Sequence, residues 1–179
     1  MRKLRNDELD RLTADEYRSA AKHPFAFVLD QVRSALNVGS IFRTADAFRA
    51  ERVVLCGITA QPPHREIQKT ALGATDAVPW EHHAATLDAV AHLRAAGYRI
   101  VSVEQAEGST SLPDFRPEPG ARYAFILGHE MRGVDAAVVA ASDLCLEIPQ
   151  WGTKHSLNVS VTAGVVAWSV VDRLRRPQQ

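Results

Sequence analysis

The feature that most constrains this fold is a regular alternation of short apolar runs with helical patterns along nearly the whole chain. Runs such as FAFVLD (25–30) and YAFILG (123–128) are apolar almost throughout, which is typical of strands that are buried on both faces. Between the runs, as in residues 37–49, apolar side chains recur at helical spacing. The sequence therefore predicts an α/β fold whose parallel sheet is covered by helices on both faces.

The same patterns predict where each element lies. The expected strands are 25–30, 52–58, 77–80, 99–105, 123–128 and 144–149, and the expected helices are 1–22, 37–49, 66–74, 84–96, 134–142 and one that starts near Ser156. Pro24 is expected to end the first helix, and Gly97 to close the helix over 84–96. We find no linker or repeat, so we expect a helical N-terminal extension over 1–23 and a single domain over 24–179.

Composition excludes some classes of protein. With 46% hydrophobic and 23% charged residues, the chain is not disordered, and its formal net charge of zero gives no overall field that attracts nucleic acid. The charged N-terminus is not a signal peptide and no window is long and apolar enough to span a membrane, so we expect a cytoplasmic protein. Cys56 and Cys145 lie in apolar runs, which predicts buried free thiols in a reducing compartment.

Polar side chains gather after three of the predicted strands, where open parallel sheets bind their ligands. These loops begin at Asp30, Gly128 and Trp151. Neither a G-x-G-x-x-G nor a G-x-x-x-x-G-K-[ST] pattern is present, which argues against a dinucleotide enzyme and a P-loop phosphatase. His82 and His83 could suggest a metal site, but the side chains of adjacent residues do not converge well on a zinc ion, so we expect no metal site.

Taken singly, the polar residues of these loops have structural interpretations. Asn37 or Ser40 could cap the helix that follows them, and Ser156 is well placed to cap the last helix. Arg43 could be an ordinary surface charge, and Glu130 could pair in solvent with a neighbouring cation.

Three stretches considered together indicate a family. NVGSIFRTADAF (37–48), FILGHEMRGVD (125–135) and CLEIPQWGTKHSLNVSVTAGV (145–165) resemble the three motifs of the SPOUT RNA methyltransferases, in the TrmH (SpoU) branch. The motifs occur in the family's order and spacing, and the resemblance covers about residues 24–172. The second motif has the core LG-x-E-x-x-G and the third has the core IP…G…SLNVS.

The resemblance implies a C-terminal deep trefoil knot, which general rules of chain topology would not predict. It also implies S-adenosylmethionine as methyl donor, a homodimer with its active site at the interface, and methylation of a ribose 2′-hydroxyl in RNA. We expect tRNA as the substrate, with rRNA as the alternative. A knotted RNA-binding protein without activity is a second alternative, and methylation of a base is less favoured for this third motif.

The resemblance assigns five catalytic residues: Asn37, Arg43, Glu130, Ser156 and Asn158. Arg43 matches the family arginine implicated in activating the hydroxyl. Because a guanidinium stays protonated, we expect it to bind the adjacent phosphate and stabilise the developing alkoxide. Asn37 would position Arg43 or the substrate, Glu130 would orient this network, and the other two would hold the knot loop and the ribose.

For the cofactor, the resemblance implies backbone groups around Gly128, Ile148 and Leu157, with Glu104 lining the same pocket. Gly133 belongs to this set as well, and we expect both it and Gly152 to meet the backbone requirements of sharp loops.

We expect recognition of RNA to come from the catalytic domain, because the roughly two dozen residues before the first predicted strand are too few for a separate RNA-binding domain. The available cations are Arg2, Lys3, Arg5, Arg11, Arg173, Arg175 and Arg176. The N-terminal ones are interleaved with acids and could equally form a solvated helix face. On the last helix, Val161, Val165 and Trp168 are expected on one face, in the knot and dimer core.

Overall fold

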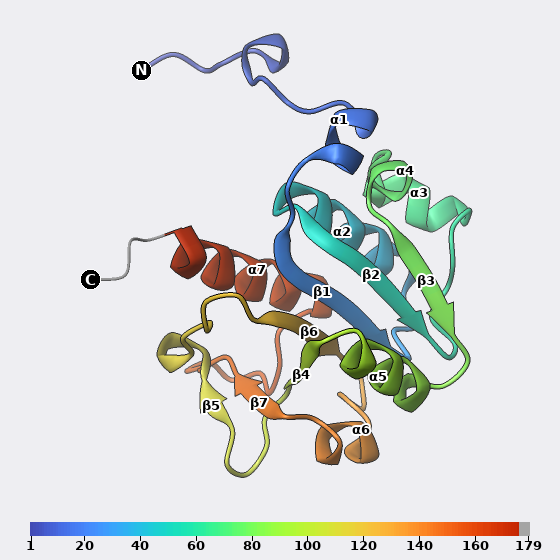
Figure 1. Cartoon of the computed structure of the whole chain (residues 1–179), viewed down its shortest axis with the longest axis vertical. Helices are drawn as coiled ribbons and strands as arrows, with labels where there is room; N and C mark the ends of the chain where they lie inside the picture. The colour runs from blue at the N-terminus through green and yellow to red at the C-terminus, as the bar shows by residue number, and fades with distance from the viewer. Residues whose placement is uncertain (176–179) are drawn as a thin grey trace.

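The computed structural model describes residues 1–175 and contains one seven-stranded sheet (Figure 1). Its strands are β1 (His23–Asp30), β2 (Ala50–Cys56), β3 (Trp80–His83), β4 (Tyr98–Val103), β5 (Thr110–Ser111), β6 (Arg122–Leu127) and β7 (Leu144–Glu147). The strand order is β3-β2-β1-β6-β4-β7-β5, and each neighbouring pair is parallel. The parallel sheet predicted from the apolar runs is confirmed.

Helices cover both faces of this sheet, as predicted. They are α1 (Ala14–Ser19), α2 (Ala35–Ala47), α3 (Arg65–Ala71), α4 (Ala74–Ala77), α5 (Thr86–Ala95), α6 (Ala136–Ala140) and α7 (Val159–Arg175), with the 3-10 turns η1 (Asn6–Glu8) and η2 (Leu112–Asp114). One apolar cluster joins the sheet to α2, α3, α4 and α7, and a second joins the opposite face to α5 and α6. Figure 1 shows α7 running beside the sheet on the side of α2, away from α5.

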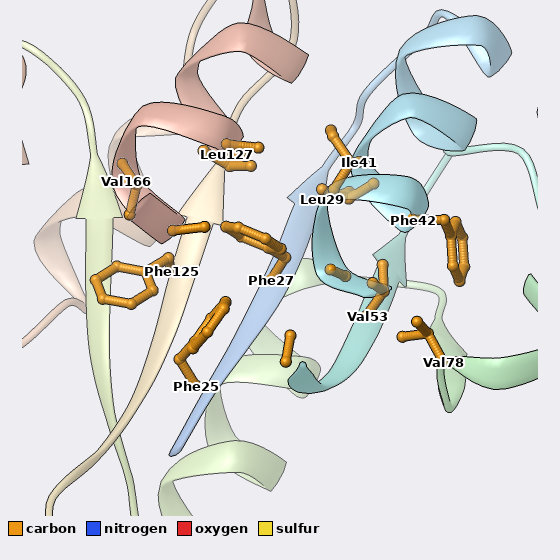
Figure 2. Close-up of a cluster of buried hydrophobic side chains, with 14 of the residues drawn as sticks. Phe25, Phe27, Leu29, Ile41, Phe42, Val53, Val78, Phe125, Leu127 and Val166 are labelled. Atoms are coloured by element: carbon orange, nitrogen blue, oxygen red, sulfur yellow. The ribbon is translucent and has the colours of Figure 1, made fainter. Parts of the chain in front are cut away.

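The two clusters follow from the alternation of side chains along each strand. On β1, Phe25 and Phe27 point into the larger cluster, whereas Ala26 and Val28 point into the smaller one. Figure 2 shows the larger cluster, where Phe25, Phe27 and Phe125 lie together, Val166 of α7 lies next to Phe125, and Ile41 and Phe42 come from α2. The ring centroids of Phe25 and Phe27 are 5.4 Å apart in an edge-on contact. Aromatic and aliphatic burial of this kind is the main stabilising term of the fold.

The predicted helix over residues 1–22 is wrong as a single element. The chain forms η1, turns at Asp10, where φ is +47°, and begins α1 after a capping box of Thr13 and Glu16. An isolated helix with a thin apolar stripe gains too little packing to stay continuous, and only Tyr17 of α1 is buried.

Other boundaries also differ from the prediction. Ala77 ends α4 rather than starting a strand, and β3 begins three residues later at Trp80. The last helix begins at Val159, after an irregular segment that includes Ser156. Gly97 does follow α5 with φ at +84°, which confirms its predicted position.

Both cysteines are free, as predicted, although Cys145 is only half-buried. Burial raises the pKa of the Cys56 thiol to about 12, so it behaves as a core side chain. The rings of His83 and His92 lie 5.5 Å apart beside Glu81, and His82 contacts the carbonyl of Gly57. Within residues 1–175, no helix has the length and apolar character that a membrane span requires.

Candidate functional site

A cavity of ≈ 570 Å³ lies at the carboxyl ends of β4, β6 and β7, and the predicted polar loops after β6 and β7 contribute to its wall. Its wall includes Glu104, Gly128, Glu130, Gly133, Ile148, Ser156, Leu157 and Asn158, which are eight of the ten predicted site residues. The other two, Asn37 and Arg43, lie on α2. A volume of this size suits a small-molecule ligand or cofactor.

Glu130 is held by three donors from the start of α2. Its Oε1 atom accepts hydrogen bonds from the backbone N–H of Ser34 and from Asn37 Nδ2, both at 2.9 Å. Its Oε2 atom accepts from the backbone N–H of Arg33 at 3.0 Å. Burial by itself would raise the pKa of Glu130, but these donors outweigh it and hold the pKa below its ordinary value. Glu130 is therefore an ionised residue that joins the β6 loop to α2, and it does not pair with a neighbouring cation.

Asn37 continues this network to α7. Its Oδ1 atom accepts a hydrogen bond of 3.2 Å from Asn158 Nδ2. The Oδ1 atom of Asn158 in turn accepts from the backbone N–H of Ser160, one residue into the last helix, at 2.9 Å. Three predicted catalytic residues thus form one chain of hydrogen bonds, Glu130 to Asn37 to Asn158, that joins all three motifs.

Two capping assignments made from the sequence are wrong. Ser34 caps α2, because its hydroxyl accepts from the backbone N–H of Asn37 at 3.4 Å. Asn158, not Ser156, caps α7, and Ser156 lies exposed on the cavity wall two residues earlier. Side-chain oxygens near the start of a helix compete for the same N–H groups, and the path of the loop decides which one reaches them.

Gly128 and Gly133 let two backbone segments pass at close range. A Cβ atom on Gly128 would lie 2.1 Å from the carbonyl carbon of Gly133. Gly133 itself has φ at +69°, and a Cβ there would lie 2.1 Å from Glu104 Oε2. That oxygen accepts a hydrogen bond of 2.9 Å from the backbone N–H of Val134. Both glycines are therefore required by the fold of the β6 loop.

The same requirement does not hold for Gly152. Its φ is outside the left-handed region and a Cβ there would meet no atom within 4 Å. The expectation that Gly152 is needed for a sharp loop is wrong within this chain. The segment around it is exposed throughout residues 151–158.

The cavity is lined by both apolar and polar side chains. Ile148 and Leu157, with Leu127 and Leu146, are the apolar ones that a ligand would meet, and Glu104 and Gln105 supply polar atoms. Gln105 Nε2 also donates a hydrogen bond to the carbonyl of His155, which ties the β4 loop to the segment before α7. Such a cavity fits a ligand with a flat apolar part and several hydroxyl or amino groups.

Arg43 lies outside this cavity. It is exposed on α2 and lines a second hollow of ≈ 460 Å³ with Ser40, Thr44, Ala47, Phe48, Lys69 and Thr70. Within one chain, the structure does not bring Arg43 together with the other four predicted catalytic residues.

Ser34, Gln105 and Thr162 belong to the site or its network and were not among the predicted site residues. Thr162 lies four residues after Asn158, which places it on the same face of α7. Helical spacing from Asn158 would have identified it. Ser34 and Gln105 lie just after strands β1 and β4, and only the contacts they make distinguish them from other loop residues.

The terminal cations divide into two groups. Arg2 pairs with Glu8 at 2.7 Å and Arg5 with Asp7 at 2.9 Å, in exposed positions that correspond to the solvated-face interpretation. Arg173 donates to the carbonyls of Leu112 and Pro113. Arg175 is exposed at the end of α7, and Arg176 lies outside the described residues.

The last helix carries an exposed apolar face. Val161, Val165 and Trp168 occur at helical spacing, and Trp168 remains 64% exposed although its ring contacts Phe48 of α2. The sequence correctly placed them on one face, but in this single chain that face is not part of the core. Leu36, in the first turn of α2, and Leu157, just before α7, are also exposed.

Comparison with known proteins points to one family. A model described as the SpoU rRNA methylase family matches residues 24–168. The tRNA (guanosine(18)-2′-O)-methyltransferase of Escherichia coli is 31% identical over 141 residues, which cover 78% of this chain and 59% of that protein. The 23S rRNA (guanosine-2′-O-)-methyltransferase RlmB of Nitrosomonas europaea is 34% identical over 140 residues, covering 77% and 52%. The chain thus spans a little over half the length of these curated relatives.

Solved structures agree with this fold. An rRNA methyltransferase from Sinorhizobium meliloti with bound AdoMet superposes with a TM-score of 0.79 at 28% identity, covering 90% of this chain and 61% of that one. A structure reporting the 2-OH methylation of C/U34 on tRNA superposes with a TM-score of 0.72 at 27% identity, covering 84% of this chain and 95% of that one.

Proposed function

The chain belongs to the SpoU rRNA methylase family, and we propose that it transfers a methyl group from S-adenosylmethionine to a ribose 2′-hydroxyl of RNA. The observation that carries the proposal is the hydrogen-bonded chain from Glu130 through Asn37 to Asn158 beside the cavity. A chain that used these loops for packing alone would not need three polar side chains to contact one another across three motifs.

The cavity supports the choice of cofactor. Its apolar lining residues Ile148 and Leu157 suit an adenine ring, and backbone groups at Gly128 and the half-buried carboxylate of Glu104 suit ribose hydroxyls. When bound, S-adenosylmethionine supplies an electrophilic methyl group on a sulfonium sulfur. A structural relative holds AdoMet at 28% identity, which supports the same assignment.

Glu130 is a positioning residue in this proposal and not a general base. Its two oxygens already accept three hydrogen bonds, and its lowered pKa makes it a weak proton acceptor. Its carboxylate orients Asn37, whose amide oxygen accepts a hydrogen bond from Asn158 Nδ2. These contacts fix the orientation of both amides beside the cavity.

Arg43 supplies the positive charge that the developing alkoxide needs. A guanidinium binds a phosphate through two parallel N–H bonds and stabilises negative charge nearby. Because Arg43 lies outside the cavity of its own chain, we assign it to the cavity of a partner subunit in a homodimer. The exposed apolar face of Val161, Val165 and Trp168 on α7, next to α2, is the surface that such a dimer would bury.

The remaining parts of the proposal rest on family membership. We assign residues 24–179 to one catalytic domain preceded by an extension over 1–23, with the C-terminal segment threaded as a deep trefoil knot. The cytoplasmic location expected from the sequence is kept as part of the proposal. We favour tRNA over rRNA, since the solved structure concerned with C/U34 on tRNA is matched over 95% of its length.

The test combines binding with transfer. Calorimetry with S-adenosylmethionine measures cofactor binding, and labelled cofactor with bulk tRNA or bulk rRNA measures transfer, followed by mapping of the methylated nucleoside. We expect transfer to tRNA, and Arg43→Ala should abolish it while cofactor affinity stays near normal. Cofactor binding without transfer to any RNA would refute the enzyme and favour a non-catalytic RNA-binding protein. Transfer to rRNA alone would refute the substrate assignment.

The dimer has its own test. Trp168→Glu places a charge on the exposed face of α7 and should convert a dimer to a monomer in sedimentation equilibrium, with loss of transfer. Arg94→Gln, an exposed change on α5, is the control and should leave the dimer intact. A wild-type protein that sediments as a monomer at micromolar concentration would contradict the shared site.

A further inference from the structure

Arg43 has a second cation beside it. The hollow on α2 that holds Arg43 is closed on its other side by Lys69, in the last turn of α3. Both side chains are exposed, and within residues 1–175 neither takes part in an ion pair. Many other arginines of the chain, such as Arg52 and Arg122, are neutralised by a glutamate.

The close packing of α2 and α3 brings these two cations together. Gly39 of α2 has no side chain, and a Cβ there would lie 2.3 Å from the carbonyl oxygen of Ile67. Thr70 Oγ1 crosses the same gap and donates a hydrogen bond of 2.9 Å to the carbonyl of Leu36. Arg43 follows Gly39 by one helical turn, and Lys69 precedes Thr70 by one residue, so both are carried to the rim of the same hollow.

The other polar atoms of the hollow are uncharged. The hydroxyls of Ser40 and Thr44 donate to the backbone carbonyls of α2 one turn earlier, at 2.9 and 3.1 Å. Their oxygens retain only acceptor capacity, and the described lining contains no carboxylate. The hollow is therefore a site of net charge +2, which attracts an anion with oxygen atoms spread over several ångströms.

We propose that Arg43 and Lys69 together bind the backbone phosphates of the RNA, and that Lys69 is the positioning residue of the pair. This inference rests on the proposed function of Arg43. Arg43 binds the phosphate next to the reacting ribose, and Lys69 binds the strand beside it as a flexible point charge. Lys69 therefore sets how tightly RNA binds and how it is aligned, while Arg43 acts on the reaction itself.

The proposal predicts a difference between binding and turnover. Lys69→Gln should raise the Kd for RNA and the KM while kcat at saturating RNA stays near that of the wild type. Arg43→Ala should lower kcat. Loss of one phosphate contact should also reduce the slope of log Kd against log salt concentration by about 0.7 to 1. Between 50 and 200 mM salt, the affinity of the variant should then change about threefold to fourfold less than that of the wild type.

Two further variants distinguish this role from a structural one. Lys69→Arg keeps the charge and should restore both the Kd and the salt slope. Arg94→Gln removes one cation from α5, on the opposite face of the sheet, and should leave both unchanged. Binding is measured by filter retention of labelled bulk tRNA at four salt concentrations, with circular dichroism to verify the fold.

Three results would overturn the proposal: an unchanged salt slope in Lys69→Gln, an equal loss in Arg94→Gln, or no recovery in Lys69→Arg. Because RNA binding is measured without turnover, these results decide the role of Lys69 even if the wild-type protein transfers no methyl group. If only methyl transfer is absent, the proposed function is contradicted. If only the salt slope is unchanged in Lys69→Gln, the phosphate site is contradicted.

Discussion

Gly133→Ala probes the loop on which the proposed cofactor site depends. The added methyl group would lie 2.1 Å from Glu104 Oε2, so the carboxylate must move away from the backbone N–H of Val134. An alanine at φ +69° costs about 1–2 kcal/mol in backbone conformation. Loss of a hydrogen bond to a charged group costs about 1.5–3 kcal/mol. The variant should therefore lose about 2.5–5 kcal/mol of unfolding free energy.

Two comparisons separate these contributions. Gly97 has φ at +84° and no atom near its Cβ position, so Gly97→Ala should cost only the backbone part, about 1–2 kcal/mol. Glu104→Ala removes the hydrogen bond without the clash and should cost about 1.5–3 kcal/mol. The double variant of Gly133 and Glu104 should be no less stable than Gly133→Ala alone, since the bond can be lost only once.

Urea unfolding followed by circular dichroism measures all four variants, with the slope of free energy against urea as a check on two-state behaviour. Calorimetry with S-adenosylmethionine provides the functional readout, because Gly133 and Glu104 both line the cavity. The reasoning is refuted if Gly133→Ala costs no more than Gly97→Ala, or if the effects of Gly133→Ala and Glu104→Ala add.

Three further predictions follow from single contacts. Asn158→Ala removes the cap of α7 and should lower the unfolding free energy by about 0.5–2 kcal/mol in urea titrations. The control, Ser156→Ala, should change the unfolding free energy by less than about 0.5 kcal/mol. Equal losses in the two variants would refute the cap assignment. Because the fold lowers the pKa of Glu130, its ionised form stabilises the protein above about pH 4.5, and this contribution is lost as pH falls through the lower folded pKa. The Tm of Glu130→Gln should therefore fall less steeply in acid than the Tm of the wild type. Parallel curves of Tm against pH would contradict this. Gly39→Ala should cost about 1–3 kcal/mol by forcing α3 away from α2, as measured by thermal unfolding, whereas Gly164→Ala, with open space at its Cβ position, should not destabilise the chain.

The layers of the fold and the edge of the sheet that carries the site could be predicted from the amino-acid sequence alone. Both conclusions depend on local patterns: a run of apolar residues must be buried on both faces, and the loops after parallel strands emerge at one edge. The three motifs also contain seven of the predicted residues that line the cavity, and the eighth, Glu104, lies outside them after β4.

Which of these side chains contact one another depends on long-range packing in the folded chain. The contact between Asn37 and Glu130 spans 93 residues and exists because β1 and β6 are neighbours in the sheet, an order that no local pattern encodes. The same holds for Arg43, whose helical position is clear from the sequence but whose place outside the cavity, in the hollow that Lys69 also lines, depends on how α2 packs against α3. Local periodicity fixes what is buried, whereas long-range packing decides which polar atoms meet, since their partners are close in space and distant in the chain.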